Sequence, residues 1–264
     1  MPYIDLSGMR MFYSDEGSGP PVVLVHGFTC DGNDWAWQIP ALAASHRVIT
    51  VDLRGHGRSS APESGYEPKQ FAADIAELLG KLQIGPVVAM GHSLGGTIVS
   101  VLAVEYPELV RAIVPVDPAY GLPEELRELV TPLMAAFAGP QAHAAAKEFF
   151  ANRFYPPASP AHLRTWHARR IEGVPHHVLA PSFRGIFEGE GQVGMGPRSL
   201  DYMRRRACPV LAFYAEPARA AVEASLAKHP YSRAVGWEGS GHFLHQERPA
   251  EFNDILTAWL AGLP

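Results

Sequence analysis

Short runs of apolar residues alternate along the chain with longer segments in which apolar residues recur at every third or fourth position. The apolar runs predict six strands, at 21–26, 47–52, 86–91, 110–117, 209–215 and 232–235. Most of these runs are apolar throughout, as is typical of strands that are covered on both faces. The amphipathic segments predict helices at 69–82, 95–106 and 249–261. Strands and helices in alternation favour an α/β fold with a parallel sheet and helices on both sides.

The strand pattern is interrupted between residues 119 and 196. Helical patterns at 124–137 and 142–154 replace it, and prolines gather around residues 156–160. We therefore expect two parts. An α/β core comprises residues 1–118 and 197–264, and a helical cap, residues 119–196, is inserted into it.

Composition restricts the partners that this chain can have. Hydrophobic residues make up 47% of the 264 residues, which is enough to bury a sizeable core. The formal charge of -5, with arginines clustered only at 204–206, argues against a nucleic-acid partner. The two cysteines, Cys30 and Cys208, are too few for a disulfide framework. Without a secretory leader pattern or an apolar stretch of about 18 residues, we expect a cytoplasmic protein with no membrane partner.

The segment Gly91-His92-Ser93-Leu94-Gly95 lies between a predicted strand and a predicted helix. This is the G-x-S-x-G pattern of a nucleophile elbow in the structural context that the pattern requires. The strand must reverse into the helix within a few residues, which strains the backbone at Ser93 and requires near-absent side chains at the two glycines. The helix N-terminus favours negative charge at the same point. We therefore predict that Ser93 is a catalytic nucleophile.

A serine hydroxyl needs a nearby base, and the base needs a third group to orient it. His242 lies on a Gly-rich loop between the last predicted strand and the C-terminal helix, a position that delivers an imidazole to the strand ends. His245 is the competitor, but we expect it to face into or beside the following helix. We predict that His242 is the base. His176 and His177 lack a third ligand, so we expect no metal.

An acyl-transfer reaction also needs hydrogen-bond donors for the oxyanion. Leu94 follows the nucleophile, so its backbone N–H is the first predicted donor. The second is expected from the loop after the strand at 21–26, where the N–H of Phe28 is best placed.

Four motifs together resemble the α/β-hydrolase superfamily: HGF at 26–28, VDLRGHGRSS at 51–60, GHSLGG at 91–96 and GSGHF at 239–243. The resemblance covers residues 10–117 and 207–262 in the family's order. It implies an eight-stranded, mostly parallel sheet whose first two strands lie in residues 2–14, a lid over the site, and the chain order Ser, acid, His. The resemblance implies that Asp52, Arg54 and His56 belong to a structural turn and take no part in the chemistry. We also expect no cofactor.

The acid of the triad departs from the family's common pattern. The usual Gly-x-x-Asp after the next-to-last strand is absent, because Ala215 and Ala218 stand at those positions. Two carboxylates remain: Asp117, at the end of the strand at 110–117, and Glu216. Some branches of the family place the acid after the earlier strand, among them zearalenone-type lactonases, which this chain resembles. We predict Asp117 as the acid and keep Glu216 as the alternative.

The cap is rich in apolar and aromatic residues. This composition favours an apolar substrate, which could be aromatic. Trp166 is the first predicted contact because its indole N–H can donate to an ester oxygen. Further predicted contacts are Tyr120, Met134, Phe137 and Phe187.

Three functions fit these features. The leading one is a hydrolase of carboxylic esters or lactones that acts through an acyl-enzyme on Ser93. The resemblance also covers cofactor-free dioxygenases of heteroaromatic rings and ligand receptors that retain a triad. Dehalogenases are disfavoured, since they need a carboxylate where Ser93 stands.

Overall fold

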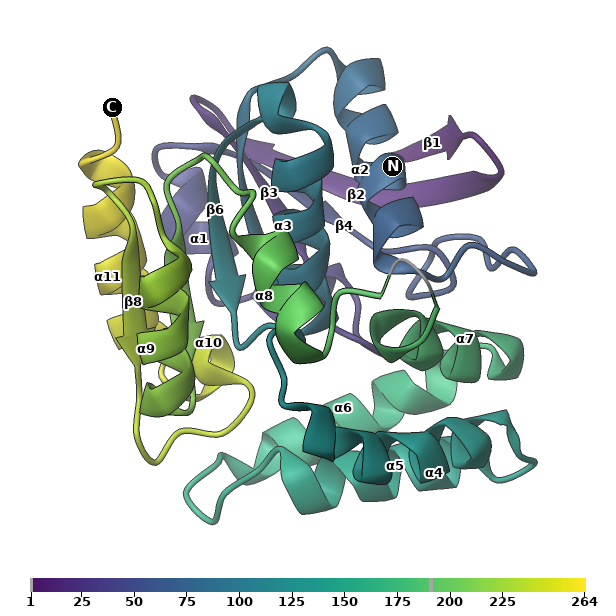
Figure 1. Ribbon diagram of the computed structural model, residues 1–264. Coiled ribbons are helices and arrows are strands. Elements are labelled where there is room, and N and C mark those ends of the chain that lie inside the picture. Colours follow the sequence, from purple (N-terminus) through teal and green to yellow (C-terminus); the bar gives the residue numbers. More distant parts are fainter. Residues whose placement is uncertain (1, 190–191) are drawn as a thin grey trace.

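The computed structural model describes residues 2–189 and 192–264, and within them it forms one eight-stranded sheet (Figure 1). The strands are β1 (Tyr3–Leu6), β2 (Met9–Gly17), β3 (Pro21–Val25), β4 (Arg47–Val51), β5 (Val87–His92), β6 (Val110–Val116), β7 (Leu211–Tyr214) and β8 (Arg233–Gly236). Their order across the sheet is β1-β2-β4-β3-β5-β6-β7-β8. The β1–β2 and β2–β4 pairs are antiparallel and the remaining pairs are parallel, which confirms the predicted fold class.

Successive residues of the central strands point to opposite faces of the sheet and into two separate cores. In β3, Val23 and Val25 face one core while Val22 and Leu24 face the other. The first face is covered by α2 (Pro68–Leu82), α3 (Leu94–Glu105), α8 (Gly196–Met203) and α9 (Pro217–Leu226). The second face is covered by α1 (Ile39–Ala43) and α11 (Pro249–Ala261). Burial on both faces explains why these strands are apolar throughout.

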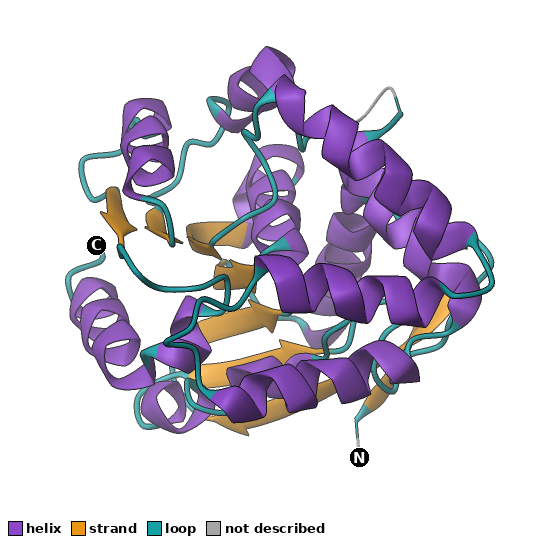
Figure 2. Ribbon diagram, turned by 90° about the horizontal axis from the view of Figure 1, so that it is seen from below, coloured by secondary structure: helices purple, strands orange, loops and turns teal. Residues whose placement is uncertain are grey.

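The segment between β6 and α8 is helical and lies at the carboxyl ends of the parallel strands (Figure 1). Its helices are α4 (Arg127–Ala138), α5 (Ala142–Arg153), α6 (Ala161–Gly173) and α7 (His176–Phe187). Seen from below, they lie across the strand ends (Figure 2). The helix expected at 124–137 begins with a 3-10 turn, Glu124–Leu126, and becomes α-helical only at Arg127.

Most predicted strands differ from the observed ones by one or two residues at an end, and two of the differences in strand boundaries have a clear structural cause. The second strand was expected to end by residue 14 but runs to Gly17, because Asp15, Glu16 and Gly17 pair with β4. The strand predicted at 110–117 ends at Val116, because Asp117 has φ 40° and leaves the extended conformation. None of the described helices is long and apolar enough to cross a lipid bilayer.

Candidate active site

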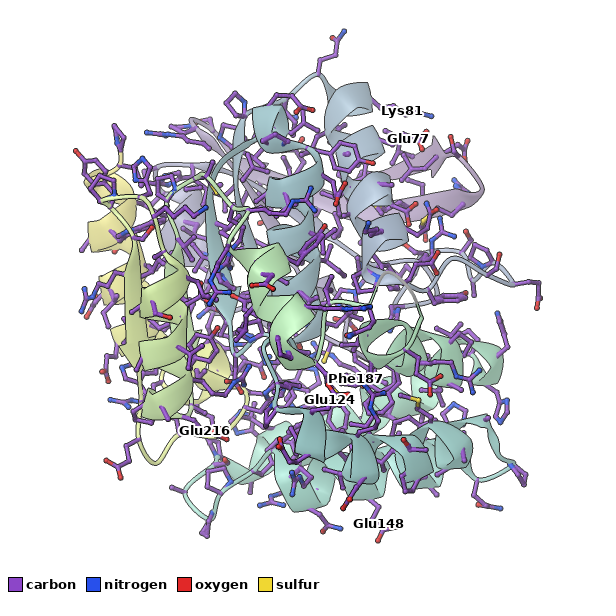
Figure 3. The ribbon with its side chains drawn as sticks, in the orientation of Figure 1. Glu77, Lys81, Glu124, Glu148, Phe187 and Glu216 are labelled. Carbon is purple, nitrogen blue, oxygen red and sulfur yellow. The ribbon has the colours of Figure 1, made fainter. Side chains whose placement is uncertain are left out.

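A cavity of about 640 Å³ is lined by residues of the core and of the cap helices. Ser93, Asp117 and His242 line it from the core side. The cap contributes apolar side chains, among them Phe150, Phe154, Phe183 and Phe187. Figure 3 labels Phe187 and Glu216, which lie along the boundary between the core and the cap, and both line this cavity. The structure therefore brings the predicted nucleophile, base and acid to one accessible space.

Ser93 occupies the sharp turn between β5 and α3. Its backbone has φ 53° and ψ -115°, a conformation that L-residues rarely adopt. The turn is tight because a Cβ on Gly91 would lie 2.1 Å from the carbonyl oxygen of Gly95, and a Cβ on Gly95 would lie 2.2 Å from that of Val25. Within the described part of the chain, the Ser93 hydroxyl has no hydrogen-bond partner, so it remains available to a ligand in the cavity.

His242 is held by contacts on both sides of its ring. Its Nδ1 lies 2.6 Å from Oδ2 of Asp117, and its ring stacks on Phe154 with 4.2 Å between the centroids. The backbone N–H of His242 donates to the carbonyl of Phe154 at 3.1 Å. Because Nδ1 is used by the carboxylate, Nε2 is the nitrogen left to act as a base.

Asp117 is a buried carboxylate with several donors around it. Burial alone would raise its pKa, but the hydrogen bond from His242 and the charge of Arg219 lower the pKa below its usual value. Arg219 Nη1 lies 3.3 Å from Oδ1, and the N–H of Ala215 donates to the same oxygen at 3.4 Å. Asp117 is therefore ionised at neutral pH and positioned against His242. Glu216, the alternative acid, is exposed and makes no hydrogen bond to His242 within the described chain.

The two predicted oxyanion donors lie on either side of the nucleophile. Leu94 is the first residue of α3, where backbone N–H groups lack partners within the helix. Phe28 lines the cavity, and its neighbour Gly27 approaches Ser93 so closely that a Cβ there would lie 3.2 Å from the Ser93 Cβ. Neither amide donates to another group of the described protein. Both N–H groups are free to bind a ligand oxygen.

Of the five predicted cap contacts, only Phe187 lines the cavity. Trp166 instead packs on Trp37, with 5.2 Å between the ring centroids. The Tyr120 hydroxyl donates to Glu223 at 2.9 Å in a buried network away from the cavity wall. Met134 and Phe137 are buried in the hydrophobic core that continues into the cap. The structure therefore does not place these four side chains on the cavity wall. Apolar periodicity shows that a helix face is buried, but not whether it faces other helices or the cavity.

Several residues that shape the site were not predicted. Phe154, which stacks on His242, appears in the sequence only as one of many aromatic residues of the cap. Arg219, which contacts Asp117, follows Ala218 in a segment whose sequence pattern concerns only the position of the acid. No local pattern could have assigned either residue, since both contacts join segments that are distant in the sequence.

The model of the alpha/beta hydrolase family matches residues 22–255. The chain belongs to the alpha/beta hydrolase family. The elbow at Ser93 and the order of serine, carboxylate and histidine along this chain agree with that membership.

Curated relatives include several hydrolases. The (E)-2-((N-methylformamido)methylene)succinate hydrolase of Acinetobacter baylyi is 25% identical over 262 residues, which cover 96% of this chain and 94% of that protein. The bifunctional epoxide hydrolase 2 of Sus scrofa is 43% identical, but over only 40% of this chain and 20% of its own length. For the epoxide hydrolase and three other curated relatives of 37–43% identity, the match covers less than half of the relative's own length.

Solved structures confirm the fold. An enol-lactonase from Burkholderia xenovorans superimposes with a TM-score of 0.84 at 21% identity, covering 98% of this chain and 100% of that one. A thermophilic esterase from Thermogutta terrifontis gives a TM-score of 0.83 at 24% identity, covering 97% and 94%.

Proposed function

We propose that this chain is a serine hydrolase that cleaves a carboxylic ester or lactone of an apolar substrate. The main support is the 2.6 Å hydrogen bond between His242 Nδ1 and Asp117 Oδ2, in the same cavity as Ser93. A carboxylate in this position fixes the tautomer of the imidazole and stabilises the imidazolium that forms when it takes a proton. The apolar cap residues favour a substrate whose surface is largely hydrocarbon.

In the proposed mechanism, the Ser93 oxygen attacks the acyl carbon while His242 Nε2 takes the hydroxyl proton. The N–H groups of Phe28 and Leu94 donate to the oxyanion of the tetrahedral intermediate. The protonated His242 then gives its proton to the leaving alcohol, and an acyl-enzyme on Ser93 remains. Water, activated by the same imidazole, attacks the acyl-enzyme and releases the acid.

Epoxide hydrolysis, the activity in the names of some relatives, is less consistent with Ser93. A serine that opened an epoxide would form an ether, and a histidine base with water cannot cleave an ether under mild conditions. A carboxylate nucleophile would instead form an ester that water can hydrolyse. The ester or lactone therefore remains the better substrate for this constellation.

The test is a panel of p-nitrophenyl esters and lactones, assayed with the wild type and with Ser93→Ala. We expect wild-type turnover that falls by about 10⁶ in the variant. An alkyl p-nitrophenyl phosphonate should label Ser93 stoichiometrically with release of p-nitrophenolate, as shown by peptide mass spectrometry, and should abolish turnover. Turnover that persists in Ser93→Ala, or O₂ uptake with a heteroaromatic substrate, would contradict the proposal.

A further inference from the structure

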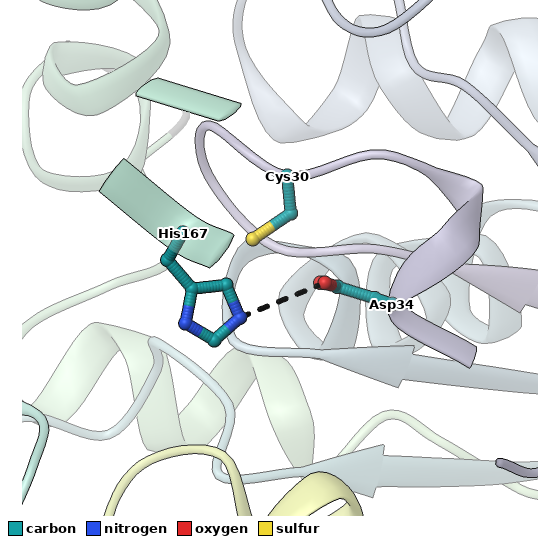
Figure 4. A group of neighbouring side chains, drawn as sticks. All are labelled: Cys30, Asp34 and His167. Atoms are coloured by element: carbon teal, nitrogen blue, oxygen red, sulfur yellow. Dashed lines mark ion pairs between the residues drawn. The ribbon is translucent and has the colours of Figure 1, made fainter. Parts of the chain in front are cut away.

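A second cluster of titratable side chains is buried next to the catalytic histidine. Asp34 belongs to the 3-10 helix η1 (Gly32–Trp35), and candidate ligand atoms of Asp34, His92 and His245 lie within 4.8 Å of one another. Cys30, Asp34 and His167 form a neighbouring group, shown in Figure 4, in which His167 Nε2 is 3.9 Å from Asp34. All five side chains are buried.

Three atoms of the Asp34, His92 and His245 group have no hydrogen-bond partner among the described residues, and neither has Nε2 of His167 in the neighbouring group. The three atoms are Oδ2 of Asp34, Nδ1 of His92 and Nδ1 of His245. The side chains that carry them are at most 1% exposed. Buried polar atoms are seldom left unpaired, because each would forfeit its hydration without compensation. The group that pairs with them can be deduced from their protonation states.

His92 presents a lone pair. Its Nε2 lies 2.9 Å from the backbone oxygen of His242, and since a carbonyl only accepts, Nε2 carries the proton. Burial lowers the pKa of His92 well below its usual value, so the ring is neutral and Nδ1 is an acceptor.

His245 presents a proton. Gln246 Nε2 lies 3.1 Å from Oδ1 of Asp34, which fixes the orientation of the Gln246 amide. The same Nε2 lies 3.2 Å from the backbone oxygen of Asp34 and 3.4 Å from Nε2 of His245. An amide nitrogen only donates, so its two N–H groups are shared among these acceptors and the ring nitrogen of His245 is one of them. Burial lowers the pKa of His245 to about 3, so its single proton lies on Nδ1.

Asp34 contributes the second acceptor. Although burial opposes its ionisation, the charge of Arg170 on α6 lowers the pKa of Asp34, and Arg170 donates to Oδ1. Oδ2 is thus an unpaired carboxylate oxygen.

Two acceptors and one donor match one water molecule, which donates twice and accepts once. We propose that Asp34, His92 and His245 bind a buried water, and that through it the Arg170–Asp34 pair holds His92, which positions His242. Three hydrogen bonds of 2.8 Å in tetrahedral directions around a water would place their outer atoms about 4.6 Å apart, and ligand atoms of these three side chains lie within 4.8 Å of one another. Water also needs no compensating charge, since Arg170 already neutralises the buried carboxylate.

A metal ion fits the donor set less well. It would require lone pairs from each ligand, but His245 Nδ1 carries the ring's proton, and burial raises the pKa of the Cys30 thiol. A divalent cation would also approach the guanidinium that is bound to Asp34.

The expected consequence concerns the loop that bears the catalytic base. His92 immediately precedes Ser93, and its N–H binds the carbonyl of His242. Because the bound water fixes the tautomer of His92, it keeps that N–H directed at His242. This positioning role rests on the proposed hydrolase function, whereas the water site itself does not.

Long-range ¹H–¹⁵N NMR of the imidazoles tests the site without any substrate. We expect His92 as the Nε2–H tautomer, His245 as the Nδ1–H tautomer, and substoichiometric metal by mass spectrometry of the protein as purified. A stoichiometric metal, or the opposite tautomer at either histidine, would overturn the water site.

Two variants test the positioning role. Gln can place an N–H near the position of Nε2, whereas Phe cannot donate. We expect His92→Phe to lose or shift the low-field proton shared by His242 and Asp117 and to lower kcat for p-nitrophenyl acetate about tenfold at an unchanged KM. His92→Gln should keep both within about twofold. If the low-field proton signal is unchanged in His92→Phe, the positioning role is refuted, whether or not the wild type is an esterase. If the signal changes as expected in the variants but the wild type shows no turnover, only the hydrolase proposal is refuted.

Discussion

The two walls of the cavity are built differently. On the core wall, three of the proposed catalytic groups follow the end of a parallel strand: the Phe28 amide after β3, Ser93 after β5 and Asp117 after β6. On the cap wall, phenylalanines from α5 and α7 predominate, held by packing alone. The core wall is therefore suited to chemistry, which needs fixed dipoles and charges, and the cap wall to the choice of substrate.

The largest expected effect is the loss of the orienting carboxylate. Asp117→Asn should lower kcat for a p-nitrophenyl ester by about 10⁴, because an amide in place of the carboxylate favours the wrong His242 tautomer and cannot stabilise the imidazolium. Steady-state kinetics at pH 8 would measure this change.

The matched control is Glu216→Gln, which removes the other carboxylate that lines the cavity. It should leave kcat within about threefold, since a change in an exposed rim charge has little effect on the buried pair. A large loss in Glu216→Gln together with near-normal activity in Asp117→Asn would show that Glu216 is the acid.

The sequence was informative where a backbone constraint restricts residue type. Ser93 could be assigned because a strand-to-helix reversal with glycines at 91 and 95 leaves a local pattern. The sequence favoured Asp117 as the acid but left Glu216 as an alternative, because β6 and β7 are neighbours and either strand end could reach His242. The cap contacts also could not be predicted. Phe137 and Phe187 have the same composition signal, yet only Phe187 lines the cavity.

The second expected effect tests the backbone constraint on the core wall. Gly91→Ala would place a methyl group 2.1 Å from the Gly95 carbonyl oxygen, so β5 and α3 must separate. The free energy of unfolding should fall by about 3 kcal/mol or more, as measured by urea denaturation. Gly80→Ala is the control: Gly80 lies on the exposed face of α2 with no atom within 4 Å of the added Cβ, and it should gain about 1 kcal/mol. Equal losses at both positions would mean that the close approach at the elbow is not the cause.

The third expected effect concerns the cap wall. Phe187→Ala should lower kcat/KM for an apolar ester about tenfold, because it removes aromatic surface that faces the substrate. Trp166→Ala should change kcat/KM less than about threefold, since its ring packs on Trp37 and Arg170 outside the cavity. Activity is compared at temperatures where both variants remain folded by circular dichroism. The reverse order would restore the original assignment of Trp166 as the substrate contact.

The smallest expected effect is also on the core wall, at the nucleophile itself. With φ 53° and ψ -115°, Ser93 carries strain of about 1–3 kcal/mol that only glycine escapes. Ser93→Gly and Ser93→Ala both remove the hydroxyl and differ in one methyl group. Glycine also increases the conformational entropy of the unfolded chain, which destabilises the folded state by about 0.5–1 kcal/mol. This offsets part of the stability gained when the backbone strain is removed. Ser93→Gly should thus be more stable than Ser93→Ala by about 1 kcal/mol in chemical denaturation. If Ser93→Ala were the more stable, the turn would accept a side chain without strain, and the hydroxyl would owe its exposure to the surrounding glycines alone.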